Sequence, residues 1–168
     1  MMLNETIIKM CYGFDNGGFV YMNIRKATVE DINGNLLDLY MDGFQYHAHE
    51  RPDIFFLKNK NQLKDELIAI LKEFHVLVLE RDGKILGFAC YKIKNVSSKV
   101  LWLDYLVIDK NYRGLGYGKM IMDALKEIAR DSLCSRVELC CWSFNQNAME
   151  IYKNIGFDEQ RIIFEMKL

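Results

Sequence analysis

The sequence predicts a mixed α/β fold with one sheet and helices on both of its faces. Apolar residues first recur every three or four positions, as in helices. Three consecutive short apolar segments typical of strands follow, and after them helix-like and strand-like segments alternate. The predicted order is β-α-α-β-β-β-α-β-α-β, and three consecutive strands followed by alternation indicate a mixed sheet. A chain of 168 residues suits one domain with a sizeable core.

Residues 1–21 differ from the rest of the chain and are predicted to be an N-terminal extension or a short hairpin. The stretch Asp15-Asn16-Gly17-Gly18 is turn-like, and only a short apolar alternation precedes it. A short strand followed by a helix is predicted to begin at Met22. Residues 22–168 are therefore predicted to form the single domain. Met22 is also a candidate for the biological start.

Two helices are predicted after this strand. Thr28 with Asp31 approximates a capping box, and apolar residues at helical spacing come after it. This helix ends before Pro52, because proline disfavours helix in the residue that precedes it. A second apolar stripe predicts a helix over 63–74.

The later elements are predicted from changes of period and from turn residues. A polar turn at Arg81-Asp82-Gly83-Lys84 indicates a hairpin. The strand 100–108 is apolar on both faces, which is typical of a central strand. The predicted strands are 76–79, 85–93, 100–108, 136–142 and 161–166, and the predicted helices between them are 119–130 and 147–153.

Composition argues against several partners. The net charge is −1, so neither a nucleic-acid backbone nor an anionic membrane is favoured as a partner. No run is long and apolar enough to span a bilayer, and the N-terminus lacks the pattern of a secretory signal, which predicts a cytoplasmic protein. Cys140 and Cys141 are adjacent, an arrangement that suits neither a disulfide nor a metal ligand pair, so no metal is expected.

A glycine-rich stretch, Arg113 to Lys119, lies between a predicted strand and a predicted helix. Such a junction offers unpaired main-chain amides to an anion. A Walker A loop is excluded because Met120 follows Gly118-Lys119 where Ser or Thr is required. The glycine spacing also fits a dinucleotide fingerprint poorly. It does match a third pattern, [Q/R]-x-x-G-x-[G/A].

With these residues the chain resembles the GNAT superfamily of acetyl-CoA-dependent N-acetyltransferases. The segment 103–109 is similar to the strand before the family's acetyl-CoA loop, and 142–148 with 151–157 is similar to its second motif, Asn and Ala followed by Tyr and Gly-Phe. The front segments 24–28 and 49–53 also fit many bacterial members. The resemblance covers residues 22–168 and implies a mixed, mostly antiparallel sheet with splayed central strands, flanked by about four helices.

The resemblance also implies where acetyl-CoA binds. The amides of the glycine loop would hold the pyrophosphate, and the pantetheine would lie along the central strand like an added strand. A backbone amide of this strand would face the carbonyl oxygen. The implied cofactor-binding residues are Leu106, Val107, Ile108, Arg113, Gly114, Leu115, Gly116, Tyr117, Gly118, Lys119, Asn145 and Tyr152.

Two residues are candidates for acid–base catalysis. Tyr152 matches the family tyrosine that would protonate the CoA sulfur. The alternative interpretation is that Tyr152 is a tyrosine of the core with no catalytic role. Asp104 shares a predicted strand face with Trp102, Leu106 and Ile108, and a carboxylate in that apolar set could act as a base, directly or through water. The alternative interpretation is that Asp104 forms an ion pair and takes no part in catalysis. Asn145 is a candidate cofactor contact, a helix N-cap, or both.

The acceptor amine is not identified by the sequence. Acceptor contacts are expected from Tyr46, His47, His49 and Glu50, although for both histidines a surface position at a helix end is the alternative. The predicted function is transfer of acetyl from acetyl-CoA to a primary amine of a small molecule or a peptide. The alternative is a noncatalytic acyl-CoA sensor. An exposed edge strand and a C-terminal strand would allow a homodimer.

Overall fold

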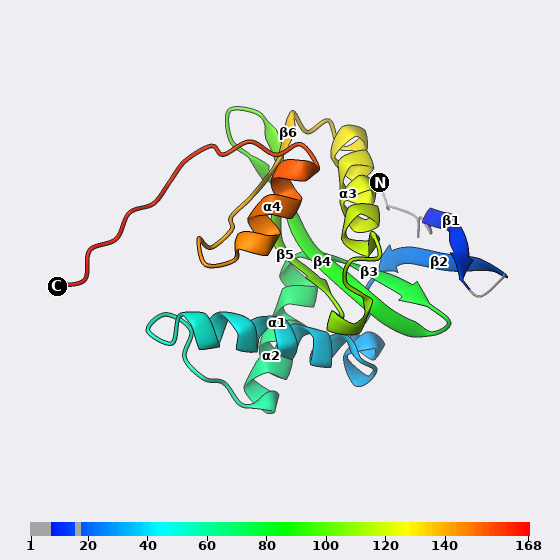
Figure 1. The fold of residues 1–168 in the computed structure, drawn as a ribbon, viewed down its shortest axis with the longest axis horizontal. Helices are drawn as coiled ribbons and strands as arrows, with labels where there is room; N and C mark the ends of the chain where they lie inside the picture. Colours follow the sequence, from blue (N-terminus) through cyan, green and yellow to red (C-terminus); the bar gives the residue numbers. More distant parts are fainter. Residues whose placement is uncertain (1–7, 16–17) are drawn as a thin grey trace.

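The computed structural model of the chain describes residues 8–15 and 18–168, with side chains from residue 20 onward. Six strands form one sheet in the order β1-β2-β3-β4-β5-β6, antiparallel except for the parallel pair β5–β6. Helices cover both faces of this sheet (Figure 1), so the predicted fold class is confirmed. Among the described residues no helix is long and apolar enough to cross a membrane.

The elements have these bounds. The strands are β1 (Ile8–Asp15), β2 (Gly18–Lys26), β3 (His75–Arg81), β4 (Lys84–Asn95), β5 (Lys99–Ile108) and β6 (Arg136–Leu139). The α-helices are α1 (Leu36–Glu50), α2 (Lys60–Glu73), α3 (Tyr117–Asp131) and α4 (Gln146–Asn154). Two 3₁₀ helices, η1 (Val29–Asn33) and η2 (Lys110–Tyr112), precede α1 and α3.

The N-terminal strands form a hairpin that continues the sheet. β1 pairs with β2, and β2 continues to Lys26 and pairs with β3. The strand predicted from Met22 therefore begins earlier, at Gly18. Residues 16–17 of the turn-like stretch lie outside the described residues. The division of the chain at residue 22 stays a prediction.

The capping box at Thr28 begins a 3₁₀ turn and not the first long helix. The Asp31 carboxylate accepts from the Thr28 backbone N–H at 2.7 Å, as the sequence predicts, but η1 ends at Asn33 and α1 begins afresh at Leu36. Arg25 donates two hydrogen bonds of 2.8 Å to the Asp31 carboxylate and thereby holds the pKa of Asp31 below its usual range. One predicted helix is therefore two elements.

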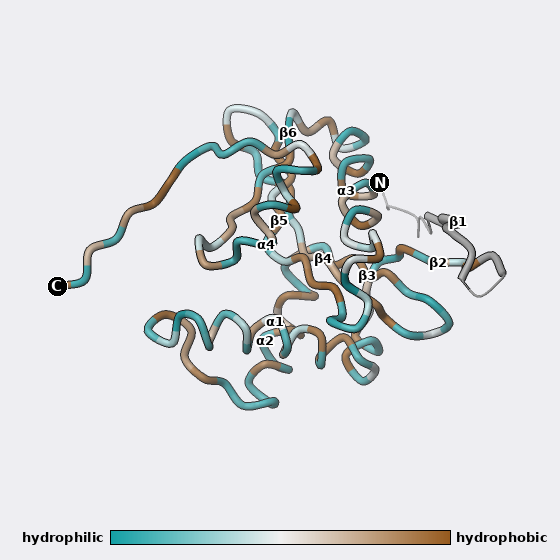
Figure 2. The backbone as a smooth tube through the Cα atoms, viewed as in Figure 1, coloured by the Kyte–Doolittle hydropathy of each residue, from teal (hydrophilic) through white to brown (hydrophobic). Residues whose placement is uncertain are grey.

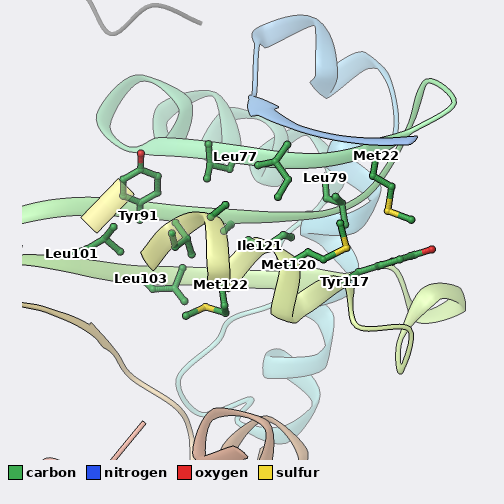
Figure 3. Close-up of a cluster of buried hydrophobic side chains, with 14 of the residues drawn as sticks. Met22, Leu77, Leu79, Tyr91, Leu101, Leu103, Tyr117, Met120, Ile121 and Met122 are labelled. Carbon is green, nitrogen blue, oxygen red and sulfur yellow. The ribbon is translucent and has the colours of Figure 1, made fainter. Parts of the chain in front are cut away.

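Each sheet face has its own apolar core. On one face η1, α1 and α2 bury Tyr40, Leu63 and Leu67 against β3 and β4. On the other face α3 presents Tyr117, Met120, Ile121 and Met122 to leucines of the sheet (Figure 3). α3 is strongly amphipathic, which is why a single helix can cover this face.

The parallel strands β5 and β6 separate after four pairs. The last pair is Leu103 with Leu139, whereas β5 continues to Ile108. β6 is shorter than the predicted strand 136–142, because the chain leaves the sheet after Leu139. Beyond Leu103, β5 therefore has a strand of the described chain on one side only. This is the splay that the family resemblance implies.

The predicted last strand, 161–166, is wrong. The residues after Phe157 form no helix or strand, and the chain runs away from the body as an extended arm (Figure 1). A strand requires a neighbour for its backbone groups, and within one chain this segment leaves the sheet edge before it finds one. Its apolar side chains are exposed, and the projecting hydrophobic stretch is visible in Figure 2.

Candidate active site

The junction between β5 and α3 is held in place by one aspartate. Asp109 follows the last residue of β5, and its own N–H donates to the Leu86 carbonyl at 2.9 Å. Its carboxylate accepts from the Asn111 backbone and side-chain N–H groups, both at 3.0 Å, and pairs with Lys84 at 3.2 Å. Burial acts to raise the pKa of Asp109, but these donors outweigh burial and the pKa lies below its usual range. The sequence did not single out this anchor.

The backbone conformation of the loop requires glycine at two positions. Gly114 (φ +79°) and Gly116 (φ +83°) lie in the left-handed region, and Gly116 is the N-cap of α3. Gly118 differs: a Cβ there would meet only Ile108 Cγ1 at 3.8 Å, an ordinary contact. The chain between Arg113 and Gly116 is exposed, and the first amides of α3 have no acceptor within the helix. Together with the dipole of α3, these amides form a geometry suited to an anion.

The side chains of the loop point in different directions. Arg113 folds back, and its Nε donates to the Ile108 carbonyl at 3.1 Å. Leu115 is exposed at the loop, whereas Tyr117 is buried and stacks on Tyr112. The Lys119 ammonium pairs with Asp123 at 2.6 Å, one turn along α3. The predicted pyrophosphate contacts at this loop thus depend mainly on backbone groups.

A β-bulge at Asp104 changes the predicted faces of β5. Cys90 pairs with Tyr105 and Tyr91 with Leu103, so Asp104 is an extra residue without an opposite partner on β4. Alternation resumes one position later. As a result Leu106 and Ile108 pack toward α3 with Leu101 and Leu103, and they do not share a face with Trp102 and Asp104. The prediction of one common face is wrong.

Beyond the bulge, β5 offers one open edge. Leu106, Val107 and Ile108 pair with Ala89, Phe88 and Gly87 of β4, and no strand of the described residues pairs with them on the other side. All three are half-buried. An extended group that supplies donors and acceptors could therefore add to β5 there. This edge leads directly into the glycine loop.

Asp104 is tied to two neighbours. Trp102 donates its Nε1–H to Asp104 Oδ1 at 2.9 Å, and the Lys92 ammonium lies 3.8 Å from Oδ2. Lys92 in turn lies over the ring of Phe74, 4.4 Å from its centroid. The ion-paired alternative is thus present in the structure, and the role of Asp104 as a base stays a prediction.

Tyr152 lies on α4, the helix that Asn145 caps. Asn145 Oδ1 accepts from the Ala148 N–H at 3.3 Å, which confirms the N-cap; its cofactor contact stays a prediction. Burial raises the pKa of Tyr152 to about 12, with a smaller contribution from Cys141. The Tyr152 ring also packs edge-on against Phe157 at 5.8 Å. At neutral pH the phenol is therefore protonated and can donate a proton.

Tyr46 and His47 belong to an aromatic cluster that joins three separate segments. The cluster consists of Tyr46 and His47 from α1, Phe55 from the following loop, and Trp142 and Phe144 from the segment after β6, with neighbouring ring centroids 5.4–5.9 Å apart. His47 Nδ1 lies 2.9 Å from the Gly43 carbonyl oxygen, which fixes the ring orientation.

The aromatic cluster differs from the predicted acceptor set. The Arg51 guanidinium lies over the Trp142 ring, 5.2 Å from the ring centroid, at one side of the aromatic cluster. His49 and Glu50 are exposed and take no part in the ring contacts of the described residues. Sequence reasoning missed Phe55, Trp142 and Phe144 as acceptor candidates. The available signal was the clustering of aromatic residues in segments that lack regular structure.

The fold and the site define a mixed α/β protein with a glycine-rich loop at the N-terminus of α3, beside parallel strands that splay apart. Residues 35–157 match the Acetyltransferase (GNAT) family, and the chain belongs to that family. The predicted family and enzyme class are therefore confirmed: the protein is a GNAT-family acetyltransferase.

Two curated relatives carry names of the same class. The chain is 27% identical over 150 residues to an uncharacterised N-acetyltransferase of Methanocaldococcus jannaschii, a match that covers 86% of this chain and 66% of that protein. It is 30% identical over 142 residues to the spermine/spermidine N(1)-acetyltransferase of Bacillus subtilis, with coverage of 79% and 85%.

Solved structures agree with the fold. A mutant form of the BH1408 protein from Bacillus halodurans superposes with a TM-score of 0.78 at 24% identity, over 86% of this chain and 98% of that chain. An aminoglycoside N-acetyltransferase in complex with CoA gives a TM-score of 0.70 at 18% identity, over 92% and 99%. At these identities the likeness concerns the fold alone.

Proposed function

We propose that this protein transfers an acetyl group from acetyl-CoA to a primary amine of a small molecule or a peptide. The observation that carries the proposal is the continuity of two main-chain features: the open edge of β5 beyond Leu103 leads into the glycine loop at the N-terminus of α3. A long cosubstrate with an amide-containing arm and a pyrophosphate matches both features in that order.

The cosubstrate fits the groups that the chain supplies. The pyrophosphate lies against the amides of residues 113–118, where Gly114 and Gly116 keep side chains away from the backbone. The pantetheine pairs with β5 along Leu106, Val107 and Ile108. The acetyl carbonyl oxygen then accepts from a backbone N–H of this strand, for which Leu106 is our candidate, and this bond strengthens as negative charge develops on the oxygen.

The reaction is a direct attack on the thioester. The amine loses a proton to Asp104, directly or through a water molecule, and its nitrogen forms a bond to the acetyl carbon. The C–S bond of the tetrahedral intermediate breaks, and the thiolate of CoA takes the proton of the Tyr152 hydroxyl. Because Tyr152 has a pKa of about 12, it holds this proton at neutral pH and regains one from solvent after each turnover.

Polyamines are the first acceptors to test. A relative of this chain is named a spermine/spermidine N(1)-acetyltransferase, and another, from Bos taurus, a thialysine N-epsilon-acetyltransferase. The aromatic cluster supports a cationic acceptor, because the faces of aromatic rings attract ammonium groups. Trp142 already lies beside the Arg51 guanidinium, so its ring is suited to such contacts.

A thiol-release assay with acetyl-CoA tests the proposal. The amine panel includes spermine, spermidine, lysine analogues and peptides with free N-termini, and a reaction without amine measures hydrolysis. We expect CoA release that depends on one class of amine. Tight binding of CoA without turnover on any amine would instead support the noncatalytic acyl-CoA sensor, for which Tyr152 and Asp104 have no function.

A further inference from the structure

The side chain of Tyr40 carries a buried hydroxyl group that has no partner. Tyr40 lies on α1 and is 2% exposed, and its ring packs against Phe88 at 6.5 Å and edge-on against Tyr105 at 5.7 Å between centroids. Within the part of the chain that the structure describes, its hydroxyl oxygen is the one buried side-chain nitrogen or oxygen without a hydrogen-bond partner. An unpaired buried hydroxyl costs folding free energy, so its presence in a native fold requires an explanation.

Two polar groups from other elements lie close to this hydroxyl. α1 and α2 lie together on one side of the sheet (Figure 1), and Glu66 of α2 stands one turn after Leu63, which packs in the same core as Tyr40. Burial raises the pKa of Tyr40, and the Tyr105 phenol and the Glu66 carboxylate raise it further. Tyr105 is 37% exposed and the Glu66 side chain 33%, so solvent reaches the place where α1, α2 and β5 meet.

An ammonium group of the chain itself occupies the Glu66 carboxylate. Lys58 Nζ donates to Glu66 Oε2 at 2.7 Å and lies 5.1 Å from the centroid of the Phe44 ring. A carboxylate and the face of an aromatic ring are two groups that attract an alkylammonium ion. The Lys58 side chain is 36% exposed, and a partly solvated ion pair of this kind is weak. The structure therefore shows an alkylammonium bound here by a side chain that a ligand can displace.

This place lies between the two parts of the proposed acceptor site. Phe44 contacts Phe55 edge-on at 6.3 Å, and Phe55 belongs to the aromatic cluster. On β5, Tyr105 directly follows Asp104, the candidate base, and precedes Leu106 on the open edge. An acceptor that reacts beside Asp104 is therefore close to these groups. The distal site, as we call it, consists of Tyr40, Phe44, Glu66 and Tyr105.

We propose that the distal site binds a second ammonium group of the acceptor, so that the preferred acceptors are aliphatic amines with two or more cationic nitrogens. The inference rests on the proposed function, because another nitrogen of the same molecule reacts beside Asp104. An ammonium group has three N–H donors, and the Glu66 carboxylate and the phenol oxygens of Tyr40 and Tyr105 provide three acceptors. The second ammonium replaces that of Lys58, and the Tyr40 hydroxyl gains the partner that it lacks.

Discrimination between diamines and monoamines follows from the same groups. A monoamine of equal length brings an apolar end to the distal site and leaves the Tyr40 hydroxyl unpaired. Sites built around buried polar groups reject analogues that lack the matching group. The ratio of kcat/KM for a diamine to kcat/KM for the monoamine of the same length therefore measures the distal site. We call it the diamine ratio.

Glu66→Gln in the full chain tests the distal site. Initial rates with acetyl-CoA are measured on a series of α,ω-diamines and on the n-alkylamines of the same lengths. Glu66→Gln removes the charge and keeps the shape, and we expect the diamine ratio to fall about 10- to 100-fold, as for the loss of a hydrogen bond to a charged group. Glu73→Gln is the matched control, because it makes the same change at an exposed position of α2 and should leave the ratio unchanged.

Two further variants examine the partners of Glu66. Lys58→Met removes the competing ammonium, so the KM for the diamine should fall several-fold. Tyr40→Phe removes a hydroxyl without a partner, so it should not lower the Tm of the unliganded chain, yet it should lower the diamine ratio. A Tm that falls by several degrees in Tyr40→Phe would show that the hydroxyl is paired within the fold and would overturn its role in the distal site.

The outcomes separate this inference from the proposed function. Amine turnover with the same diamine ratio in the parent chain and in Glu66→Gln overturns the distal site alone. Turnover confined to monoamines or to peptides does the same. The absence of turnover on every amine, with acetyl-CoA bound, instead overturns the proposed function, and the distal site is then rejected with it.

Discussion

The glycine loop and the aromatic cluster are built in opposite ways. The loop is one continuous stretch, from Arg113 to Lys119, and backbone geometry defines it: two left-handed glycines and a helix N-terminus. The aromatic cluster consists of side chains from three segments that lie far apart in the sequence. The part of the site that is proposed to bind the cosubstrate is therefore encoded locally, whereas the part proposed to meet the acceptor exists only after folding.

Tyr152→Phe tests the chemistry between these two regions and should have the largest effect. Removal of the hydroxyl leaves the ring packing on Phe157 intact but removes the proton for the leaving thiolate. We expect kcat to fall about 10²–10⁴-fold, with little change in the KM for acetyl-CoA. Steady-state kinetics and an acid-quench burst experiment measure this. An unchanged kcat with chemistry shown to be rate-limiting would remove Tyr152 from the mechanism.

Asp104→Asn separates a base from a structural ion pair. If Asp104 accepts the proton of the amine, kcat/KM for the amine falls about 10²-fold while the Tm changes little. Lys92→Met is the control, because it removes the ion-pair partner and leaves the carboxylate. Equal losses of Tm in both variants, with activity retained in both, would identify Asp104 as structural.

Gly116→Val tests the loop side of the comparison. A β-branched residue is strained at a φ of +83°, and its side chain covers the amides at the start of α3. We expect the KM for acetyl-CoA to rise about tenfold or more, as for the loss of one or more charge-assisted hydrogen bonds. Gly118→Ala is a control for a tolerated substitution in the same loop, since a Cβ there meets only an ordinary contact. Similar KM values for the two variants would be evidence against backbone recognition.

Trp142→Ala tests the acceptor side. The aromatic cluster loses the ring that contacts Phe55 and Phe144. The KM for the amine should rise several-fold, consistent with about 0.5–2 kcal/mol for a cation–π contact, while the KM for acetyl-CoA stays the same. Kinetics with each substrate varied in turn separate the two constants. A parallel rise of both would mean that the two regions are not independent.

The contrast also explains what the sequence could and could not predict. The glycine loop, the helix α3 and the turn at Asp82-Gly83 depend on local residue types, and the structure has all three. The bulge at Asp104 depends on pairing with β4, so strict alternation assigned Leu106 to the wrong face. The C-terminal stretch 161–166 has a strand pattern, but a strand also needs a neighbour, and periodicity alone does not identify one.

Asp109→Asn should have the smallest effect on catalysis, because Asp109 anchors the loop and is expected to act on the stability of the fold. The pKa of Asp109 is lowered in the folded chain. Its ionised form therefore stabilises the fold at pH values above the unfolded pKa of about 3.9. This stabilisation is lost as the pH falls through the folded pKa. The asparagine side chain of the variant has nearly the same shape as the carboxylate, but without the charge its contacts to Asn111 and Lys84 are weaker. We expect a loss of about 1–3 kcal/mol at pH 7, or several degrees in Tm.

The pH dependence distinguishes this anchor from a general loss of packing. The Tm difference between the parent chain and Asp109→Asn should be largest near neutral pH. It should shrink below about pH 4, where the carboxyl group of the unfolded chain takes up a proton, and it should vanish below the lower pKa of the folded chain. Thermal unfolding at a series of pH values measures it. A Tm difference that is constant across this range would show that the charge of Asp109 does not stabilise the loop. The glycine loop would then owe its conformation to the backbone alone.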